Sequence, residues 1–192
     1  MKNFTTFVLS LLFFLIVFNA HAQRSGGYIG ASFGTAVPIG TFAKNEIRHS
    51  NGGLATSGGA LNLIDFGYKF NRNLGIAASV GGAYCNMGHT SLSSQITYGG
   101  FFIGPAISLP LGRCLDFTIT PKVGTTSAAY NIREVAFVEE KGIGYELGVS
   151  LHYNVGRKWH IFFDNAYSQA DYGDNFRIMS FNSKLGLAFR LR

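Results

Sequence analysis

The clearest pattern in the chain is a two-residue alternation of apolar and polar positions from Gly142 to Tyr167. The odd-numbered positions are mostly apolar or aromatic, namely Ile143, Tyr145, Leu147, Val149, Leu151, Tyr153, Val155, Trp159, Ile161, Phe163 and Tyr167. The alternation pauses at Gly156-Arg157-Lys158 and resumes in the same register, so Val155 is expected to pair with Trp159. The pattern predicts a β-hairpin with one apolar face and one polar face.

The same alternation recurs along most of the chain and predicts six more strands. They cover Gly27–Thr35, Gly58–Phe70, Leu74–Tyr84, Gln95–Leu109, a segment beginning at Leu115, and Arg177–Leu191. Short turns alternate with long polar loops, which are expected at about residues 40–53, 86–94, 133–141 and 168–175. Pro105 and Pro121 fall inside two strands and count against them, because proline removes a donor from a sheet. The chain is predicted to be all-β, with eight antiparallel strands in up-and-down order.

Aromatic residues eight positions apart favour lipid as the partner of the apolar face. The three pairs are Tyr145 and Tyr153, Trp159 and Tyr167, and Phe181 and Phe189. Eight residues of a tilted strand climb roughly 21 Å, close to the ~25 Å apolar band between the aromatic girdles of an outer-membrane barrel. A soluble β-sandwich also alternates, but nothing in it requires aromatics at this interval. These residues are predicted to form the girdles of a transmembrane β-barrel.

The interior of the predicted barrel is expected to be nearly plugged. An open sheet would leave unpaired amides in lipid, so the last strand should pair with the first. A closed eight-stranded barrel is just wide enough inside for side chains. Polar residues of inward parity are expected to fill it as a hydrogen-bonded or ion-paired network: Asp65, Lys122, Glu146, His152, Asp164 and Lys184.

Residues 1–22 have the order of a secretory signal peptide. Lys2 precedes an apolar run from Phe4 to Phe18, and Ala20-His21-Ala22 supplies the small residues of a cleavage site. Cleavage is expected between Ala22 and Gln23, which leaves residues 23–192 as the barrel domain. The alternative, an N-terminal membrane helix, has a run shorter than the ~20 residues that a span needs. The mature protein is expected in the outer membrane of a Gram-negative cell envelope.

Basic residues gather where the short turns are expected. The chain has 16 Lys and Arg against 10 Asp and Glu, a formal net charge of +6. The basic positions on this side, which should be periplasmic, are Arg24, Lys69, Arg72, Arg113, Arg157, Lys158, Arg190 and Arg192. Solvated turns explain them in the simplest case, and contact with anionic phospholipid head groups is the sharper hypothesis. Nucleic acid is not expected as a partner, because the charges form a rim without a groove of stacking aromatics.

No catalytic, metal-binding or cofactor-binding residues are expected. Ser150, His152 and Asp164 could meet across the hairpin as a hydrolase triad, but all three share the inward parity of a narrow lumen. The five His and two Cys residues show no metal spacing. Cys85 and Cys114 are expected at opposite ends of the barrel, too far apart for a disulfide.

Four short segments carry a family resemblance. They are Ala20-His21-Ala22-Gln23, Val37-Pro38-Ile39-Gly40-Thr41-Phe42, Tyr68-Lys69-Phe70-Asn71-Arg72-Asn73-Leu74 and Leu185-Gly186-Leu187-Ala188-Phe189-Arg190-Leu191. The chain resembles small outer-membrane β-barrel proteins of the OmpA/OmpX-like kind and, more narrowly, the PorT-type barrel families. The resemblance implies an eight-stranded barrel in the outer membrane, in some cases linked to protein secretion, and no active-site residue.

The sequence therefore favours a non-enzymatic integral barrel, surrounded by outer-membrane lipid and expected to be a monomer. Its four long loops would serve a structural or surface-contact role, although the pattern identifies no partner for them. One alternative is a narrow pore or a PorT-like secretion component. Another is a lipid-modifying barrel enzyme.

Overall fold

The computed structural model is a closed barrel of antiparallel strands, in which each strand pairs with its neighbours in the chain and β8 pairs with β1. It describes residues 26–43, 55–87, 94–131, 138–172 and 176–191. The strands are β1 (Gly26–Pro38), β2 (Ala55–Lys69), β3 (Leu74–Met87), β4 (Ser94–Pro110), β5 (Leu115–Asn131), β6 (Val138–Asn154), β7 (Trp159–Tyr172) and β8 (Phe176–Leu191). A short 3-10 helix, η1 (Gly40–Ala43), follows β1. The predicted fold class, strand number and closure are confirmed.

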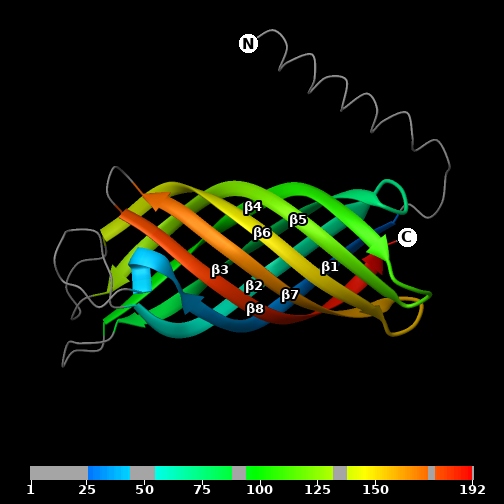
Figure 1. The fold of residues 1–192 in the computed structure, drawn as a ribbon, viewed down its shortest axis with the longest axis horizontal. Coiled ribbons are helices and arrows are strands. Elements are labelled where there is room, and N and C mark those ends of the chain that lie inside the picture. The colour runs from blue at the N-terminus through cyan, green and yellow to red at the C-terminus, as the bar shows by residue number, and fades with distance from the viewer. Residues whose placement is uncertain (1–25, 44–54, 88–93, 132–137, 173–175, 192) are drawn as a thin grey trace, which may run out of the picture.

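The two ends of the barrel differ in their connections. The turns β2–β3, β4–β5 and β6–β7 lie together at one end, on the side of the C-terminus, and η1 lies at the other end (Figure 1). We call these the short-turn end and the loop end. In the β6–β7 turn, the Val155 amide donates to the Trp159 carbonyl oxygen at 3.0 Å, as the sequence predicts.

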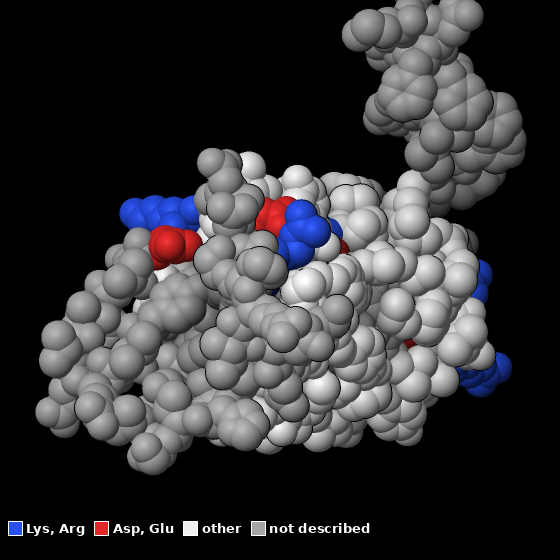
Figure 2. All heavy atoms as spheres, turned by 60° about the vertical axis from the view of Figure 1, so that its left-hand side comes forward, with Lys and Arg blue, Asp and Glu red and all other residues white. Residues whose placement is uncertain are grey.

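The alternation of the strands separates an apolar outer wall from a polar interior. Outward side chains such as Phe33 and Leu63 are 67% and 65% exposed, whereas inward ones such as Ser32, Asn62 and Lys184 are buried. Figure 2 shows Lys, Arg, Asp and Glu near the ends of the molecule and almost none on the visible wall between them. Among the described residues, no helix is both long enough and apolar enough to cross a membrane.

A bulge in β2 changes which residues face outward. The pairing of β2 with β3 shifts register between Asn62 and Ile64, so Leu63 and Ile64 both point outward. Below the bulge the predicted outward residues, from Ile64 to Phe70, are confirmed. On the loop side of the bulge the outward residues of β2 are odd-numbered, because one extra residue reverses the parity of a strand.

Pro105 and Pro121, which counted against two strands, belong to one seam. The β4–β5 ladder pairs Ile103 with Val123 and resumes at Ile107 with Ile119, so the two prolines lie opposite each other in the gap. Each still takes its place in the ladder on its other side, opposite Ile76 and Leu147 respectively. Placing both missing donors at one cross-strand position confines the loss of hydrogen bonds to a single point of the barrel.

The fourth predicted loop, residues 168–175, is mostly wrong. Strand β7 continues to Tyr172, with Ser168, Ala170 and Tyr172 buried inside the barrel. The outward residues here, Gln169 and Asp171, are polar, and this hid the continuation of the strand. The predicted signal peptide, its cleavage site at Ala22 and Gln23, and most of the first loop lie outside the described residues, so they stay predictions.

The packing of β4 against β5 can be tested at Gly100, where the backbones of the two strands approach closely. A Cβ atom there would overlap the backbone carbonyl oxygen of Thr125 and lie 2.8 Å from the Cα atom of Thr126. We expect Gly100→Ala to lower the free energy of unfolding in detergent by about 1–3 kcal/mol, measured by denaturant titration, because backbone must move to admit the methyl group. The matched control is Gly112→Ala, since a Cβ at Gly112 would meet no atom within 4 Å. Equal losses in the two variants would contradict this packing.

Candidate functional site

The centre of the lumen holds two buried ion pairs, each formed by cross-strand neighbours. Lys122 on β5 lies opposite Glu146 on β6, and Lys122 Nζ is 2.5 Å from Glu146 Oε1; both side chains are 7% exposed. Lys184 on β8 lies opposite Asp164 on β7, with Nζ 3.4 Å from Oδ2. Lys122 Nζ also donates to Ser79 Oγ at 3.1 Å. Pairing of this kind offsets part of the large cost of removing each charge from water.

A third carboxylate, Asp65, is held by neutral donors. Ser32 Oγ donates to Asp65 Oδ2 at 2.6 Å, and Asn62 Nδ2 donates to Asp65 Oδ1 at 2.8 Å. Sequence parity identified Asp65, but the bulge in β2 brings Asn62 inward as well. Together, Asp65 and the two ion pairs form what we call the central network.

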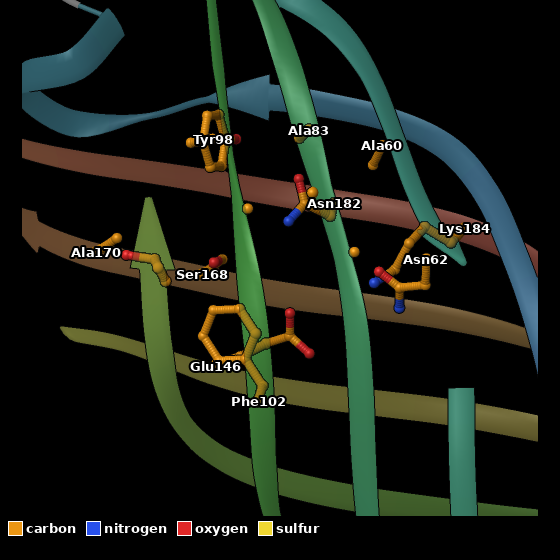
Figure 3. A pocket seen from close by; sticks show the side chains of 14 residues that line it. Ala60, Asn62, Ala83, Tyr98, Phe102, Glu146, Ser168, Ala170, Asn182 and Lys184 are labelled. Atoms are coloured by element: carbon orange, nitrogen blue, oxygen red, sulfur yellow. The ribbon is translucent and has the colours of Figure 1, made fainter. Parts of the chain in front are cut away.

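A small cavity adjoins the central network (Figure 3). Its volume is about 30 Å³, and its lining includes Glu146, Lys184, Asn62 and Asn182. Asn182 is buried, and its Oδ1 atom has no hydrogen-bond partner among the described residues. One water needs roughly 10–15 Å³ and at least two polar partners, so this space suits one or two water molecules and is too small for an organic substrate.

The loop end of the lumen is closed by apolar side chains. Phe42 of η1 is 2% exposed, and its ring meets that of Tyr98 edge-on with centroids 6.3 Å apart. Gly40 has φ +65, a conformation that favours glycine, and it turns the chain inward after Ile39 donates to the Met179 carbonyl oxygen. Phe42 joins a buried cluster drawn from the loop-side ends of the strands: Ala36, Ala55, Ala60, Ala83, Cys85, Ile96, Tyr98, Ala128, Ala170, Tyr172 and Ile178.

The short-turn end is closed by stacked rings and polar pairs. Tyr28 packs against His160, with centroids 4.8 Å apart, and His152 stacks on Phe162 at 5.4 Å. The sequence identified His152 alone, although Tyr28, His160 and Phe162 share its inward parity. Two further contacts complete this closure: Lys69 Nζ lies 3.0 Å from Asp116 Oδ2, and Arg190 donates to Asn154 Oδ1.

The possible catalytic triad is only partly assembled. His152 Nε2 and Ser150 Oγ are 3.2 Å apart, and Ser150 lies opposite Asp164 as the hairpin register predicts. Asp164, however, contacts Lys184, and the His152 ring contacts Ser150, Tyr28, His160 and Phe162. A triad needs the acid on the second ring nitrogen of the histidine, and that contact is not present among the described residues.

The residues predicted to form the aromatic girdles lie on the outer wall. Tyr145, Tyr153, Trp159 and Phe181 are exposed, while Tyr167 and Phe189 are half-buried. The pairs Tyr167–Phe181 and Trp159–Phe189 are direct cross-strand neighbours on β7 and β8. They therefore lie as two separate bands, one toward each end of the wall.

Basic side chains at the short-turn end divide into two groups. Lys69 and Arg190 turn into the lumen mouth, as described above. Arg72, Arg113, Arg157 and Lys158 are exposed. Arg24 and Arg192 lie outside the described residues.

The two cysteines lie at opposite ends of the barrel, as predicted. Cys85 is buried near the loop end of β3, and Cys114 is exposed in the β4–β5 turn. Both are free. In the part of the chain that the structure describes, no group of three or more His, Cys, Asp or Glu residues is arranged to hold a metal ion.

Comparison with solved structures identifies the kind of barrel. Neisserial surface protein A (NspA) aligns with a TM-score of 0.59 and 11% identity, over 88% of this chain and 99% of that one. Ail, the attachment invasion locus protein of Yersinia pestis, aligns in its complex with the heparin analogue sucrose octasulfate with a TM-score of 0.52 and 14% identity, over 87% of this chain and 97% of that one. The chain has the fold of a small outer-membrane β-barrel. No protein-family model and no curated protein sequence matches it, and the narrower resemblance to PorT-type barrels stays a prediction.

The central network can be tested by removing one charge. We expect Glu146→Gln to lower the free energy of unfolding by about 3–5 kcal/mol, because Lys122 would remain buried without its partner. Denaturant titration of the purified protein in detergent measures the change. Lys69→Gln, at the more exposed pair with Asp116, should cost about 1 kcal/mol or less. Replacing both partners of this pair, Lys122→Met with Glu146→Leu, should restore much of the lost free energy of unfolding. A double variant that is less stable than Glu146→Gln would contradict the proposed pairing.

Proposed function

We propose that this protein is a non-enzymatic integral protein of the outer membrane, with a closed lumen and a loop end that serves a structural or surface-contact role. The observation that carries the proposal is that the polarity of a soluble protein is reversed, with an apolar wall outside and a charged, filled interior. A largely apolar outer wall is unfavourable in water and suited to lipid. Closed antiparallel barrels of eight strands also occur in soluble proteins, so it is the apolar outer wall, and not the size of the barrel, that supports the membrane role.

Closure of the lumen supports a non-conducting protein. The apolar cluster around Phe42, the central network and the rings around Tyr28 fill three successive levels of the interior. An ion crossing the barrel would have to displace buried side chains at each level. These contacts weigh against the alternative of a narrow pore.

The geometry of Ser150, His152 and Asp164 supports a role other than lipid hydrolysis. All three are buried inside the lumen, and Asp164 pairs with Lys184. A lipid in the membrane would meet the outward residues of the same strands and not these three inward ones.

A role at the loop end agrees with the fold that this chain shares. NspA is by name a surface protein, and Ail is by name an attachment protein that has been crystallised with a heparin analogue. We carry over only the general role, contact made at the exposed end of a rigid barrel. A PorT-like part in secretion is a narrower hypothesis that rests on the sequence resemblance.

The exposed basic residues of the short-turn end are proposed to contact anionic phospholipid head groups. Arg72, Arg113, Arg157 and Lys158 are exposed in the short turns, and the outward rings Tyr68, Tyr153 and Trp159 lie at the strand ends that these turns join. Long basic side chains can lay their stems along the wall and place their charges at the level of the head groups.

Membrane insertion and closure are tested together in one preparation. We expect the mature protein to show a heat-dependent shift in gel mobility, because a closed barrel resists detergent until it is boiled. In planar bilayers it should give no steady ion conductance, because the lumen is filled at three levels. A protein that stayed monodisperse in buffer without detergent would rule out the membrane role, whereas stable channels would favour the pore.

The proposed lipid contact is tested by neutralising the basic rim. Changing Arg72, Arg113, Arg157 and Lys158 to Gln should remove a preference for anionic over zwitterionic lipid, since each such charge near an anionic surface contributes about 1 kcal/mol. Binding of spin-labelled anionic lipid to the reconstituted barrel measures the preference. Lys141→Gln, an exposed residue at the loop end of β6, is the control and should leave it unchanged. An equal preference in the rim variant and the wild type would refute the contact.

A further inference from the structure

The outer wall of β7 and β8 differs from the rest of the barrel at mid-height. Near the middle of the other six strands the outward residues are apolar: Phe33, Leu63, Val80, Phe101, Val123 and Leu147. In the middle of β7 and β8 the outward residues are Asn165 and Ser183. Figure 1 shows these two strands side by side along the barrel. A polar group at this depth faces hydrocarbon if lipid covers it.

Asn165 and Ser183 are cross-strand neighbours with hydrogen-bonding capacity left over. Ser183 Oγ donates to Asn165 Oδ1 at 2.7 Å. The amide nitrogen of Asn165 carries two donors, and it has no hydrogen-bond partner among the described residues. The hydroxyl proton of Ser183 is already donated to Asn165, but Ser183 Oγ can still accept a hydrogen bond. One residue of the pair thus offers donors and the other offers an acceptor.

Polar contacts continue from this pair toward the loop end. Tyr167 donates to Gln169 Oε1 at 3.2 Å, and Gln169 Nε2 donates to Asp171 Oδ2 at 3.3 Å. Across the seam, Arg177 Nε donates to Asp171 Oδ1 at 2.5 Å. We call Asn165, Gln169, Asp171, Arg177 and Ser183 the polar strip.

Apolar residues border the polar strip on β6. Leu147, Tyr145 and Ile143 lie opposite Tyr167, Gln169 and Asp171 respectively, and all three are outward and exposed. The strip is therefore bounded by apolar residues on the β6 side. On the other side Ser183 lies opposite Thr35 of β1, which is also outward and exposed. The polar residues stay confined to one side of the barrel, which suits a contact with one protein neighbour.

We propose that the polar strip is the interface between two copies of this chain in the membrane. The inference rests on the membrane role proposed above, and it replaces the monomer expected from the sequence. Two copies inserted in the same sense are related by a two-fold axis along the membrane normal. If that axis passes in front of the β7–β8 seam, β7 of one copy faces β8 of the other.

This symmetry makes the strip complementary to itself. The free donors of Asn165 would face the accepting oxygen of the partner's Ser183. Asp171 would face the partner's Arg177, so opposite charges meet twice across the axis. A second copy supplies matched groups for Asn165 and Ser183, and lipid chains supply none. Asp171 and Arg177 lie on the loop side of the Tyr167–Phe181 band, where their charges would add to the contact nearer the membrane surface.

The test measures association of the mature protein in phosphatidylcholine vesicles. Cys114 is exposed and distant from the strip, so fluorescent donor and acceptor dyes can be attached there. Energy transfer should rise and saturate as the protein-to-lipid ratio increases. Asn165→Leu with Ser183→Ala should raise the half-saturating ratio at least tenfold. The matched control, Thr125→Leu on the outer wall of β5, should leave it unchanged.

A charge-swap experiment distinguishes contact between copies from contact within one copy. Asp171→Arg protein mixed with Arg177→Asp protein should give more energy transfer than either variant alone, because opposite charges then meet only between copies. No excess in the mixture, an unchanged half-saturating ratio in the Asn165 and Ser183 variant, or a wild type that stays monomeric at all ratios would each overturn the dimer. Heat-shifted mobility and flotation with the vesicles are measured in parallel. A protein that inserts as a monomer would overturn the dimer alone, whereas one that fails to insert would overturn the proposed function as well.

Discussion

The structure depends on one constraint: every backbone amide of a strand that faces lipid must find a partner in another strand. The pairing of β8 with β1, from Gly27 with Leu191 to Pro38 with Ser180, meets this constraint at the only place where a sheet would otherwise have edges. Closure then fixes the rest. It sets the width of the lumen, and it forces each strand to present one face outward and one face inward along its whole length. It also explains why Pro105 and Pro121 share a seam, since a missing donor is tolerated best where its neighbour across the strand also lacks one.

Closure also decides how charge is held inside. Inward residues that are cross-strand neighbours lie close enough to form ion pairs, as Lys122 and Glu146 do, and Asp164 and Lys184. Such pairs can satisfy each other in a space too narrow for bulk water. The interior is therefore a packed core made of polar side chains, with apolar closure at one end and ring stacking at the other. A protein built this way offers its ends, and not its lumen, for contact with other molecules.

The outer wall is less uniform than its apolar composition indicates. Leu63 and Ile64 both point outward where the bulge in β2 reverses the parity of the strand. Asn165 on β7 and Ser183 on β8 place hydrogen-bonding groups near mid-height on the wall. A wall that served only as a boundary with lipid would have no use for polar groups at that depth. The proposed contact between two copies would give the polar groups of β7 and β8 a partner at that depth.

The sequence by itself determined the number of strands, most of their faces and the closed fold, because the two-residue repeat is a local property of the chain. It placed Asp65, Lys122, Glu146, Asp164 and Lys184 on the inward face for the same reason. Parity could not show that Asn62 turns inward, because the bulge depends on the pairing of β2 with its neighbours. Nor could it show that Phe42 closes the loop end or that Tyr28 meets His160, because these contacts join segments far apart in the chain. Only the closed register of all eight strands brings such residues together, since a cross-barrel contact is fixed by the stagger of the strands and not by the order of residues within any one of them.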